Sequence, residues 1–432
     1  MADFIRLFFS GIICTYLFFV GMASYDQNFI KKYISEPALG LNTFFFLIQE
    51  PPFFNQWWFN IPKSDKKGVV TYTPEKTWGD YTIYANTNNN EISLIDLNGT
   101  KVKSLSANIP KEKIAYNDQA TITRIFLDTT NPKNLYAMFW GEKNTLNHYG
   151  IIKYDIDLNI LWYNDLKFHH NIEFIDNNTF ITYESVYRNT PHPVVPQLTP
   201  PYIEEKVTFL STQDGSIKRS ISLLDAFWGT EYQAILENLN LSPSDPNMGD
   251  GDLMHPNTIT LVPKYIAQKY PKISNQSIMI SMRNLDLIAF LDLETEKITW
   301  AFLGPWRGQH STKFLENGNI IMLDNQGNAA EGGPSRILEI NMDNLAIEWE
   351  YTGTKDTPFH TPYNGMIDIL PNGNILISET HSGRIFEVNK DKEIVWDYYE
   401  KERVETWGTP RIPSVFNAKR LTKQQALQLI KE

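Results

Sequence analysis

The fold is decided by a stretch that reads Gly308-Gln309-His310 … Glu316-Asn317-Gly318-Asn319 … Ser335-Arg336-Ile337-Leu338-Glu339-Ile340 … Glu348-Trp349-Glu350. The next stretch repeats it as Phe359-His360 … Pro371-Asn372-Gly373-Asn374 … Gly383-Arg384-Ile385-Phe386-Glu387-Val388 … Val395-Trp396-Asp397. A looser copy begins near Leu253. Each copy has a His-bearing entry, an apolar strand, an Asn-Gly type turn, a second strand and a closing Trp. A period of about 50 residues built from short strands predicts propeller blades.

Extending this repeat toward the N-terminus predicts an all-β, six-bladed β-propeller. The apolar N-terminal segment described below predicts a membrane-spanning helix in front of the propeller. The expected blades cover about 69–106, 118–164, 166–222, 253–302, 308–351 and 358–399, and the extended segment 404–417 is expected to complete a terminal blade. The expected domain organisation is 1–25 as a transmembrane anchor or uncleaved signal, 26–67 as an aromatic-rich linker, 68–420 as the propeller and 421–432 as a C-terminal helix or tail.

Composition and charge exclude several classes of protein. The 432-residue chain is 42% hydrophobic and 13% aromatic, which suffices for a buried core, so disorder is not expected to dominate. A net charge of -11 without any clustered cationic run argues against a nucleic-acid partner. Cys14 is the single cysteine, which excludes an intramolecular disulfide and a cysteine-rich metal site.

The N-terminal segment 7–23 is uncharged and apolar, and it approaches the roughly 20 residues that span a bilayer. Gly21-Met22-Ala23 is a poor cleavage site for a signal peptidase, which favours a retained anchor. Lys31 and Lys32 follow the segment, so the charge pattern does not define its orientation.

The closing tryptophans are expected to fill the core between neighbouring sheets. One stands near the end of each of four repeats: Trp162, Trp300, Trp349 and Trp396.

The histidines are the candidate functional residues. Aligning the blades on their first strand puts His170, His255 and His310 at one position, the entry to the strand nearest the axis, so their side chains are expected to face a central channel. Blade six has Gly365 at that position, with His360 before it and His381 after the second strand.

The last three blades resemble the bacterial arylsulfotransferases. The resemblance covers about residues 250–400 and rests on Met254-His255-Pro256-Asn257-Thr258-Ile259, Ser281-Met282-Arg283-Asn284, Gly308-Gln309-His310 with Leu323-Asp324-Asn325, Ser335–Ile340, Leu370–Asn374 and Gly383–Val388.

This resemblance implies a six-bladed propeller, exported or membrane-tethered, with an extracytoplasmic (periplasmic) propeller domain. It implies transfer of a sulfuryl group from an aryl sulfate to a phenol or another hydroxyl through a sulfated histidine, without the nucleotide sulfate donor PAPS and without a metal or organic cofactor. A neutral imidazole is a suitable nucleophile, and Arg and His donors would stabilise the charged sulfuryl oxygens.

The resemblance also implies roles for individual residues. His255 and His310 correspond to donors that hold the sulfuryl or phenolic oxygen, and Arg336 to the sulfuryl-binding arginine. Either His381 or His360 is expected to be the nucleophile. The remaining residues, expected to bind substrate, are His170, Asn257, Arg283, Asn325 and Arg384.

Three alternatives stay open at this point. Arg336 and Arg384 could instead form structural pairs with Glu339 and Glu387. The histidines could join Asp252, Asp324, Asn325 and Glu379 around a calcium or zinc ion, as in a metal-dependent propeller hydrolase. A third alternative is a propeller that only binds a glycan or a protein, because the fold alone does not define a function.

Overall fold

The computed structural model describes residues 59–110, 120–129, 131–141, 148–195, 198, 200–237, 251–328, 332–406 and 409–429. The chain forms two compact units, Met1–Gln56 and Trp57–Glu432, and every described residue belongs to the second. The expected membrane span and most of the expected linker lie outside the described residues. Within the described ranges, no helix has the length and apolarity needed to cross a membrane.

The described part of the chain is an all-β structure of antiparallel sheets. Three sheets come mainly from the first half of the chain, and only β28 is C-terminal. Sheet 1 is β28(Val415–Leu421), β3(Tyr81–Asn86), β4(Glu91–Asp96), β5(Lys101–Ser106); sheet 2 is β6(Thr121–Leu127), β7(Asn134–Gly141), β8(His148–Asp155), β9(Ile160–Asn164); sheet 3 is β10(Phe168–Asp176), β11(Thr179–Arg188), β12(Tyr202–Ser211), β13(Ile217–Ser222).

Three further sheets repeat the same order. Sheet 4 is β14(Pro256–Leu261), β15(Ser277–Met282), β16(Leu287–Asp292), β17(Lys297–Leu303); sheet 5 is β18(His310–Phe314), β19(Ile320–Asp324), β20(Arg336–Ile340), β21(Ile347–Thr352); sheet 6 is β22(Met366–Ile369), β23(Ile375–Glu379), β24(Arg384–Val388), β25(Ile394–Tyr399) and β2(Gly68–Tyr72).

Few other elements are present in the described ranges. The strands β1(Phe59–Asn60), β27(Thr409–Pro413) and β26(Val404–Thr406) form a small separate sheet. The helices are short: α4(Leu223–Phe227), α5(Gln233–Glu237), α6(Lys264–Lys269) and α7(Lys423–Leu429), with one-turn helices η1(Arg283–Leu285) and η2(Thr380–Ser382).

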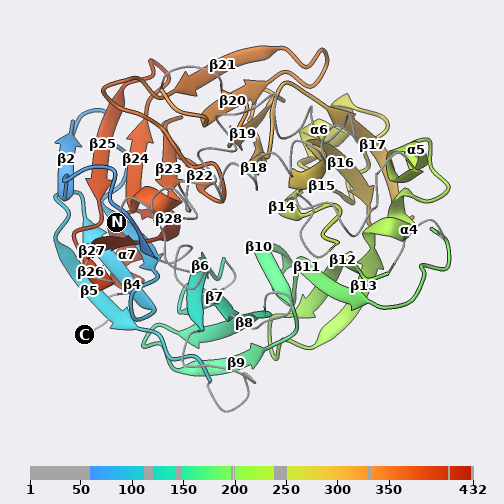
Figure 1. Cartoon of the computed structure of the whole chain (residues 1–432), viewed down its shortest axis with the longest axis horizontal. Helices are drawn as coiled ribbons and strands as arrows, with labels where there is room; N and C mark the ends of the chain where they lie inside the picture. The colour runs from blue at the N-terminus through green and yellow to red at the C-terminus, as the bar shows by residue number, and fades with distance from the viewer. Residues whose placement is uncertain are drawn as a thin grey trace, which may run out of the picture. The chain divides into compact units, whose positions relative to one another are not determined.

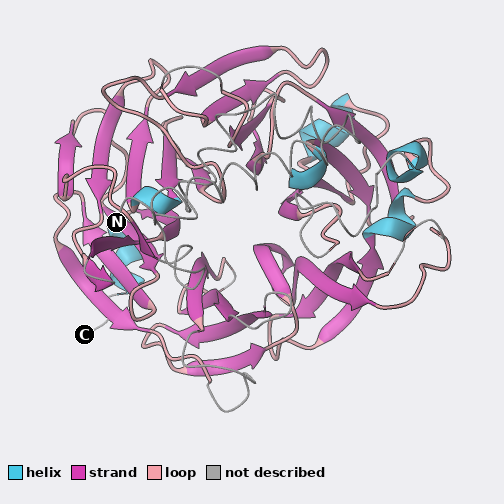
Figure 2. Ribbon diagram, in the orientation of Figure 1, coloured by secondary structure: helices cyan, strands magenta, loops and turns pink. Residues whose placement is uncertain are grey.

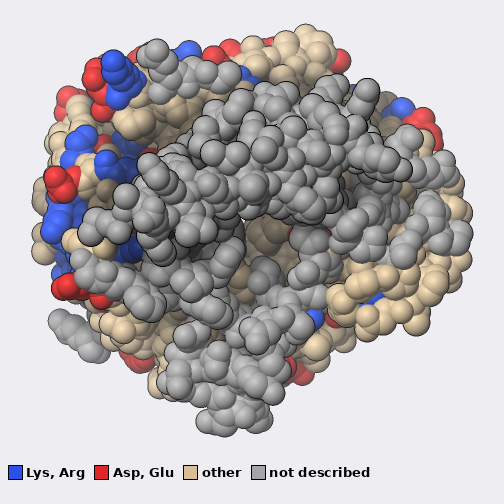
Figure 3. Space-filling model, in the orientation of Figure 1, with Lys and Arg blue, Asp and Glu red and all other residues tan. Residues whose placement is uncertain are grey.

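Sheets 1 to 6 follow one another around a central axis in the manner of a propeller (Figures 1 and 2). The first strand of each sheet lies nearest the centre, and neighbouring first strands contact one another, as β10 does β14 and β22 does β28. The view of Figure 3 has the same orientation and shows Lys, Arg, Asp and Glu side chains mixed along the rim of this face. Residues from distant parts of the sequence therefore meet at the axis.

Strands from the two ends of the chain pair with sheets formed mainly by the opposite end. β28 pairs with β3 and becomes the innermost strand of sheet 1, while β2 pairs with β25 and becomes the outermost strand of sheet 6. The structure differs here from the expected blade limits, because β2 leaves the first sheet and the C-terminal strand enters it. Pairing each terminal segment with the sheet from the other end of the chain satisfies the backbone groups along the edges of β3 and β25.

A hydrophobic cluster fills each of the six spaces between consecutive sheets, including the space between sheets 6 and 1. The closing tryptophans belong to these clusters or pack against them, as expected. In three cases the indole Nε1 also donates to a carbonyl in a turn of the next sheet: Trp162 to Thr212 at 3.2 Å, Trp349 to Lys390 at 2.9 Å and Trp396 to Leu97 at 2.8 Å. The buried indoles of Trp162 and Trp396 need such a partner, so these side chains link neighbouring sheets as well as filling space.

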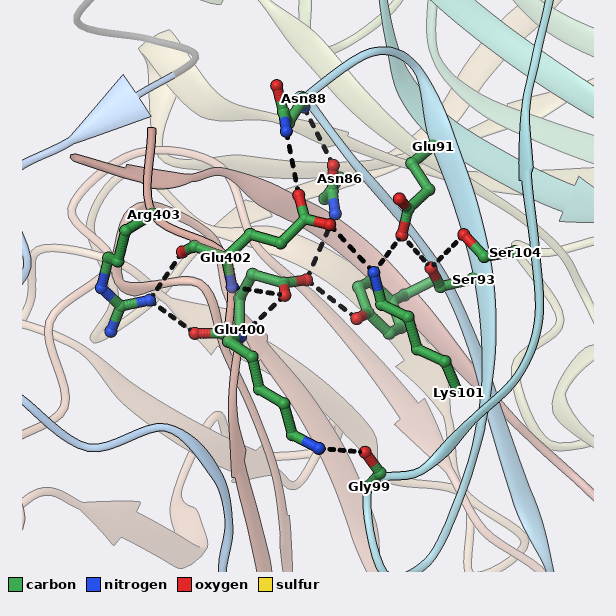
Figure 4. Close-up of polar contacts among 12 residues, drawn as sticks. Asn86, Asn88, Glu91, Ser93, Gly99, Lys101, Ser104, Glu400, Glu402 and Arg403 are labelled. Atoms are coloured by element: carbon green, nitrogen blue, oxygen red, sulfur yellow. Dashed lines mark hydrogen bonds and ion pairs between the residues drawn. The ribbon is translucent and has the colours of Figure 1, made fainter. Parts of the chain in front are cut away.

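A polar network reinforces the seam between sheets 6 and 1 (Figure 4). Buried Glu400 accepts hydrogen bonds from the Tyr84 hydroxyl at 2.8 Å and from Asn86 Nδ2 at 3.2 Å. Lys101 of β5 reaches Glu402 at 3.0 Å. Because Tyr84 and Asn86 come from the other end of the chain, this network fixes how the two ends meet.

Candidate functional site

The entry to several innermost strands is irregular, and the candidate histidines lie there. The pairing register shifts between His169 and Glu173 in β10, between Pro256 and Thr258 in β14, and between His310 and Lys313 in β18. His170, His255 and Ser311 have positive φ angles of 66°, 47° and 54°. Bulges redirect side chains, and left-handed backbone in residues other than Gly is concentrated at functional sites.

These bulges bring the three imidazoles together. The ring centroids of His170 and His255 are 4.8 Å apart, and those of His170 and His310 are 6.4 Å apart. The three rings come from sheets 3, 4 and 5, and from positions as distant in sequence as 170 and 310. The convergence expected from the register of the repeats is therefore present, and we call these three residues the histidine triad.

Hydrogen bonds set the tautomer of His310. Its Nδ1 donates to Asn325 Oδ1 at 2.7 Å and faces the Gly308 carbonyl oxygen at 3.0 Å. The Asn325 amide is oriented by its own Nδ2, which donates to the carbonyls of Thr361 and Asn364. Both partners of Nδ1 are acceptors, so Nδ1 carries the proton and Nε2 keeps a lone pair.

The other two triad members follow the same rule. His255 Nδ1 hydrogen-bonds to the Asp252 carboxylate, which also accepts from the His255 backbone N–H at 3.1 Å. His170 Nδ1 lies 2.6 Å from Nδ1 of His169, whose Nε2 in turn lies 2.9 Å from Glu205 Oε2. A carboxylate only accepts, so His169 donates through Nε2 and accepts through Nδ1. All three triad rings therefore have an unprotonated Nε2 in their neutral form.

Two arginines accompany the triad. Arg124, from β6, donates to Asn364 Oδ1 at 3.2 Å and lies over the Phe416 ring. Arg283 begins η1, with its guanidinium over the ring of Tyr363. Burial, followed by Arg124, holds the pKa of His170 well below its ordinary value.

The pKa of His310 is also held well below its ordinary value, first by burial and then by Arg283. Burial alone would raise the pKa of Asp252, but its contact with His255 lowers this pKa overall. The triad thus combines two imidazoles held neutral, those of His170 and His310, with fixed guanidinium charge and an ionised carboxylate bonded to His255, a combination suited to a small anionic group.

Arg336 and Arg384 have structural partners. Arg336 Nε donates to Asp324 at 2.8 Å and Nη2 to the Pro305 carbonyl at 2.6 Å. Arg384 pairs with Asp397 through two donors, at 2.7 and 3.0 Å, and with Glu379 at 3.2 Å.

The alternative pairing of Arg336 with Glu339 and of Arg384 with Glu387 is not the one observed. Residues three apart on a strand point to opposite faces, so neither Glu lies on the side of its Arg. Instead, Asp324 is the cross-strand neighbour of Arg336, and Glu379 is that of Arg384.

His360 and His381 belong to a second cluster, around Lys63. Lys63 Nζ contacts His360 Nδ1, and the His360 backbone N–H donates to Glu379 at 3.2 Å. Burial first, and Lys63 second, lower the pKa of both imidazoles to about 4. Lys63 and His360 line a cavity of about 450 Å³ that also includes Arg384 and Tyr399. The sequence suggested one histidine site, and the structure has two groups of histidines.

Two of the remaining predicted residues, Asn257 and Asn325, hold the segments that carry the triad in place. Asn257 is buried and donates to the Gln309 carbonyl at 2.7 Å, joining the entries of β14 and β18. Asn325 orients His310, as described above. Asp324 is bound to Arg336, and within the described ranges no group of three or more His, Cys, Asp or Glu side chains is arranged to hold a metal ion.

The channel continues beyond the triad as a cavity of about 480 Å³ lined by all six innermost strands. Asn171 and Ser311, which follow two triad histidines in sequence, form part of its wall. Lys313 and Lys419 both approach Asp368 there, at 3.6 and 2.7 Å. The triad therefore lies toward one end of the channel.

Sequence reasoning gave no site role to Arg124, His169 and Glu205. Arg124 is the inner-strand residue of a sheet without an entry histidine, and its position in the repeat was the available signal. The His169-His170 pair was visible as a dipeptide. Glu205 could not be found, because its contact with His169 depends on a pairing across two strands of sheet 3.

Comparison with known families gives one match. The family model described as Arylsulfotransferase (ASST) matches residues 155–401, more than half of the 432-residue chain. The matched region includes the histidine triad and Arg283. No curated protein is significantly similar to the chain in sequence.

Solved structures similar to the chain are distant. A protein of unknown function from Bacteroides caccae has 11% identity and a TM-score of 0.41, covering 75% of this chain and 95% of that one. The Dos1 propeller has 11% identity and a TM-score of 0.39, covering 80% and 75%. A catalytically inactive variant of virginiamycin B lyase from Staphylococcus aureus, with quinupristin, has 14% identity and a TM-score of 0.37, covering 82% and 99%. These similarities carry no functional argument.

The tautomer of His310 can be measured directly. In nitrogen-15 spectra of histidine-labelled protein, His310 should stay in the neutral Nδ1–H form as the pH falls through 6.5, the ordinary pKa of an imidazole, because burial and Arg283 disfavour a second proton. The signal is assigned by its loss in His310→Asn. If the His310 ring took up a second proton near pH 6.5, where an ordinary imidazole titrates, the measurement would contradict this electrostatic account.

Proposed function

Because the chain belongs to the arylsulfotransferase family, we propose that it transfers a sulfuryl group from an aryl sulfate to a phenol or another hydroxyl through a sulfohistidine, without PAPS. We further propose that sheets 1 to 6 are the six blades of one closed propeller. The observation that carries the proposal is the meeting of three imidazoles, each with a hydrogen-bonded Nδ1, beside Arg124 and Arg283.

His310 is the proposed nucleophile. Its Nε2 attacks the sulfur, the bond from sulfur to the aryl oxygen breaks, and its electron pair leaves with the phenolate. The acceptor oxygen then attacks the same sulfur, and the N–S electron pair returns to Nε2. Arg283, His255 and Arg124 all lower the pKa of His310. A low-pKa imidazole is neutral when it attacks and is also a good leaving group in the second step.

His255 and the arginines have supporting roles. Asp252 accepts from His255 Nδ1 and holds that ring in place; when Nε2 takes up a second proton, His255 can donate a hydrogen bond to the sulfuryl group or to the departing oxygen, and the carboxylate offsets its charge. Arg283 and Arg124 provide fixed positive charge where the equatorial sulfuryl oxygens gain negative charge. The mechanism uses no metal or organic cofactor.

This assignment differs from the one based on sequence, in which His381 or His360 attacks and Arg336 binds the sulfuryl group. The cluster of His360 and His381 has Lys63 as its cation, and Arg336 is engaged with Asp324 and Pro305. The triad offers more converging donors for one anionic group, which is why we favour it.

The covalent intermediate provides the first test. Brief exposure of the protein to 4-nitrophenyl sulfate should add one sulfuryl group to His310, detected by peptide mass spectrometry, and nitrophenol release should not require added metal. His310→Asn should reduce turnover by roughly a thousandfold or more, because it removes the nucleophile.

His381→Asn and His360→Asn are the matched controls and should keep activity within a few fold. A sulfuryl group on His381 or His360 would transfer the nucleophile role to that cluster. Absence of turnover with any aryl sulfate would favour the propeller that only binds its ligand.

The arginines provide the second test. Arg283→Met should lower kcat by roughly 10² to 10³, the usual effect of removing one donor that stabilises the transition state, with little change in folding. Arg336→Met is the control: it removes the partner of buried Asp324 and should lower stability, while kcat of the folded fraction stays close to wild type. Equal effects of the two substitutions on kcat would argue against a role for Arg283 in transfer.

We also propose that segment 7–23 anchors the protein in a membrane with its propeller outside the cytoplasm. The support is the sequence alone: the stretch is uncharged and close to the length of a bilayer span. The full chain should remain in the membrane pellet after alkaline carbonate extraction, whereas a variant with several Asp substitutions in 7–23 should be released. Release of the wild-type chain would contradict the anchor.

A further inference from the structure

A hydrogen-bonded chain continues behind His170, away from the other triad members. His169 Nδ1 lies 2.6 Å from His170 Nδ1, and His169 Nε2 lies 2.9 Å from Glu205 Oε2. The second oxygen of Glu205 accepts from the Ser185 hydroxyl at 2.9 Å. His169 and Glu205 are each 4% exposed, and His170 is 7% exposed. The chain therefore has fixed partners and little contact with water.

The packing around this chain restricts its rings. His169 stacks on Tyr183 at 5.7 Å with an interplanar angle of 22°, and its ring stands nearly perpendicular to that of His170. His170 is also held by its left-handed backbone. In this arrangement the two nitrogens of His169 face His170 and Glu205, so a proton can move along the line of these atoms.

The hydrogen-bonded series of His170, His169 and Glu205 has two states that differ by one proton. In the first, Glu205 is ionised, His169 is protonated on Nε2, and His170 on Nδ1, so His170 Nε2 is a lone pair. In the second, a proton added at His170 Nε2 has shifted the other two along the chain, leaving a proton on the Glu205 carboxyl. Both states keep the two hydrogen bonds that join His170, His169 and Glu205, so the free energy of exchange between them includes no lost hydrogen bond.

We infer that Glu205 and His169 are positioning residues that make His170 the general base for the hydroxyl acceptor in sulfuryl transfer. The inference rests on the proposed function and extends it. It assigns the three imidazoles of the triad different tasks: His310 carries the sulfuryl group, His255 donates, and His170 accepts the proton.

The proton balance of the second half-reaction is complete. The acceptor O–H gives its proton to His170 Nε2 while the oxygen attacks the sulfur on His310. The His170 Nδ1 proton moves to His169 Nδ1, and the His169 Nε2 proton moves to Glu205. The N–S bond breaks and its electron pair returns to His310 Nε2. The proton on Glu205 returns by the same route to the next phenolate that leaves, or to water.

The charges around the chain explain why a carboxylate must end it. His170 faces Arg124, His255 and His310, which all oppose a positive charge on its ring, and burial opposes it further. His169 opposes a positive charge on His170 as well, and its own carboxylate partner is Glu205, at 2.9 Å, while Tyr183 stacks on the His169 ring. Moving the proton to Glu205 removes a negative charge at the far end and avoids an imidazolium next to Arg124.

Glu205→Gln tests the relay, because the amide keeps the shape but cannot take the proton. The neighbouring Glu204→Gln is the matched control, since Glu204 lies on the same strand with its side chain bonded to Arg188 at 2.6 Å. For each protein we would measure formation of sulfohistidine from 4-nitrophenyl sulfate in one turnover, and then its transfer to a series of phenols across pH.

We expect Glu205→Gln to form sulfohistidine within about threefold of the wild-type rate, because 4-nitrophenolate leaves without a proton. Transfer to unactivated phenol should slow by roughly 10²-fold, the usual contribution of a general base. Acidic nitrophenols, which are already ionised, should restore most of the rate, and the rate with phenol should rise with pH as phenol ionises. Glu204→Gln should behave as wild type in every respect.

The outcomes separate the two proposals. If wild-type protein forms no sulfohistidine, the proposed function fails. If sulfohistidine forms normally but Glu205→Gln keeps the wild-type rate, pH profile and acceptor dependence, the relay is wrong. Should Glu205→Gln fail to fold, His169→Gln serves instead, because its amide can still donate to Glu205 but cannot pass a proton. The same loss confined to unactivated acceptors supports the relay, and a wild-type profile overturns it.

Discussion

The seam between sheets 6 and 1 is the contact on which the rest of the structure depends. Arg420 of β28 donates to Thr82 in sheet 1 at 2.8 Å and to Glu387 in sheet 6 at 2.9 Å, and the Arg420 and Glu387 side chains are fully buried. Such a pair is costly to break, because the remaining charge would be buried alone. The seam therefore has a preferred geometry, which the buried Glu400 network reinforces. The direct contacts of β10 with β14 and of β14 with β18 in turn set the distances between the imidazoles of sheets 3, 4 and 5.

The site illustrates how burial and fixed charge select a protonation state. His310 and His170 are buried beside arginines, which keeps their imidazoles neutral, and each has an oriented partner at Nδ1. The three partners differ: an amide and a carbonyl for His310, a carboxylate for His255, and a second imidazole for His170. Differences in these partners, rather than in the rings themselves, are what allow one type of side chain to take three tasks.

Much of the fold followed from the sequence because its signals are local. The Asn-Gly turns, the strand lengths and the repeated Trp reflect backbone and packing requirements that each blade must meet separately. The register of His170, His255 and His310 was visible for the same reason. The exchange of β2 and β28 was not, because either end of the chain could pair with either edge, and only the whole ring decides which pairing removes more exposed edge.

The sequence by itself determined the repeat, the all-β class and which histidines share a position in it. Only the tertiary structure decided the electrostatic and hydrogen-bond partners. These are Arg124 and Arg283 beside the triad, Asp324 for Arg336, and Glu205 for His169. The reason is that hydrogen bonds and charge interactions act over a few ångströms in space. Strand periodicity tells which face a side chain takes, but not which residue of another strand or sheet meets it there.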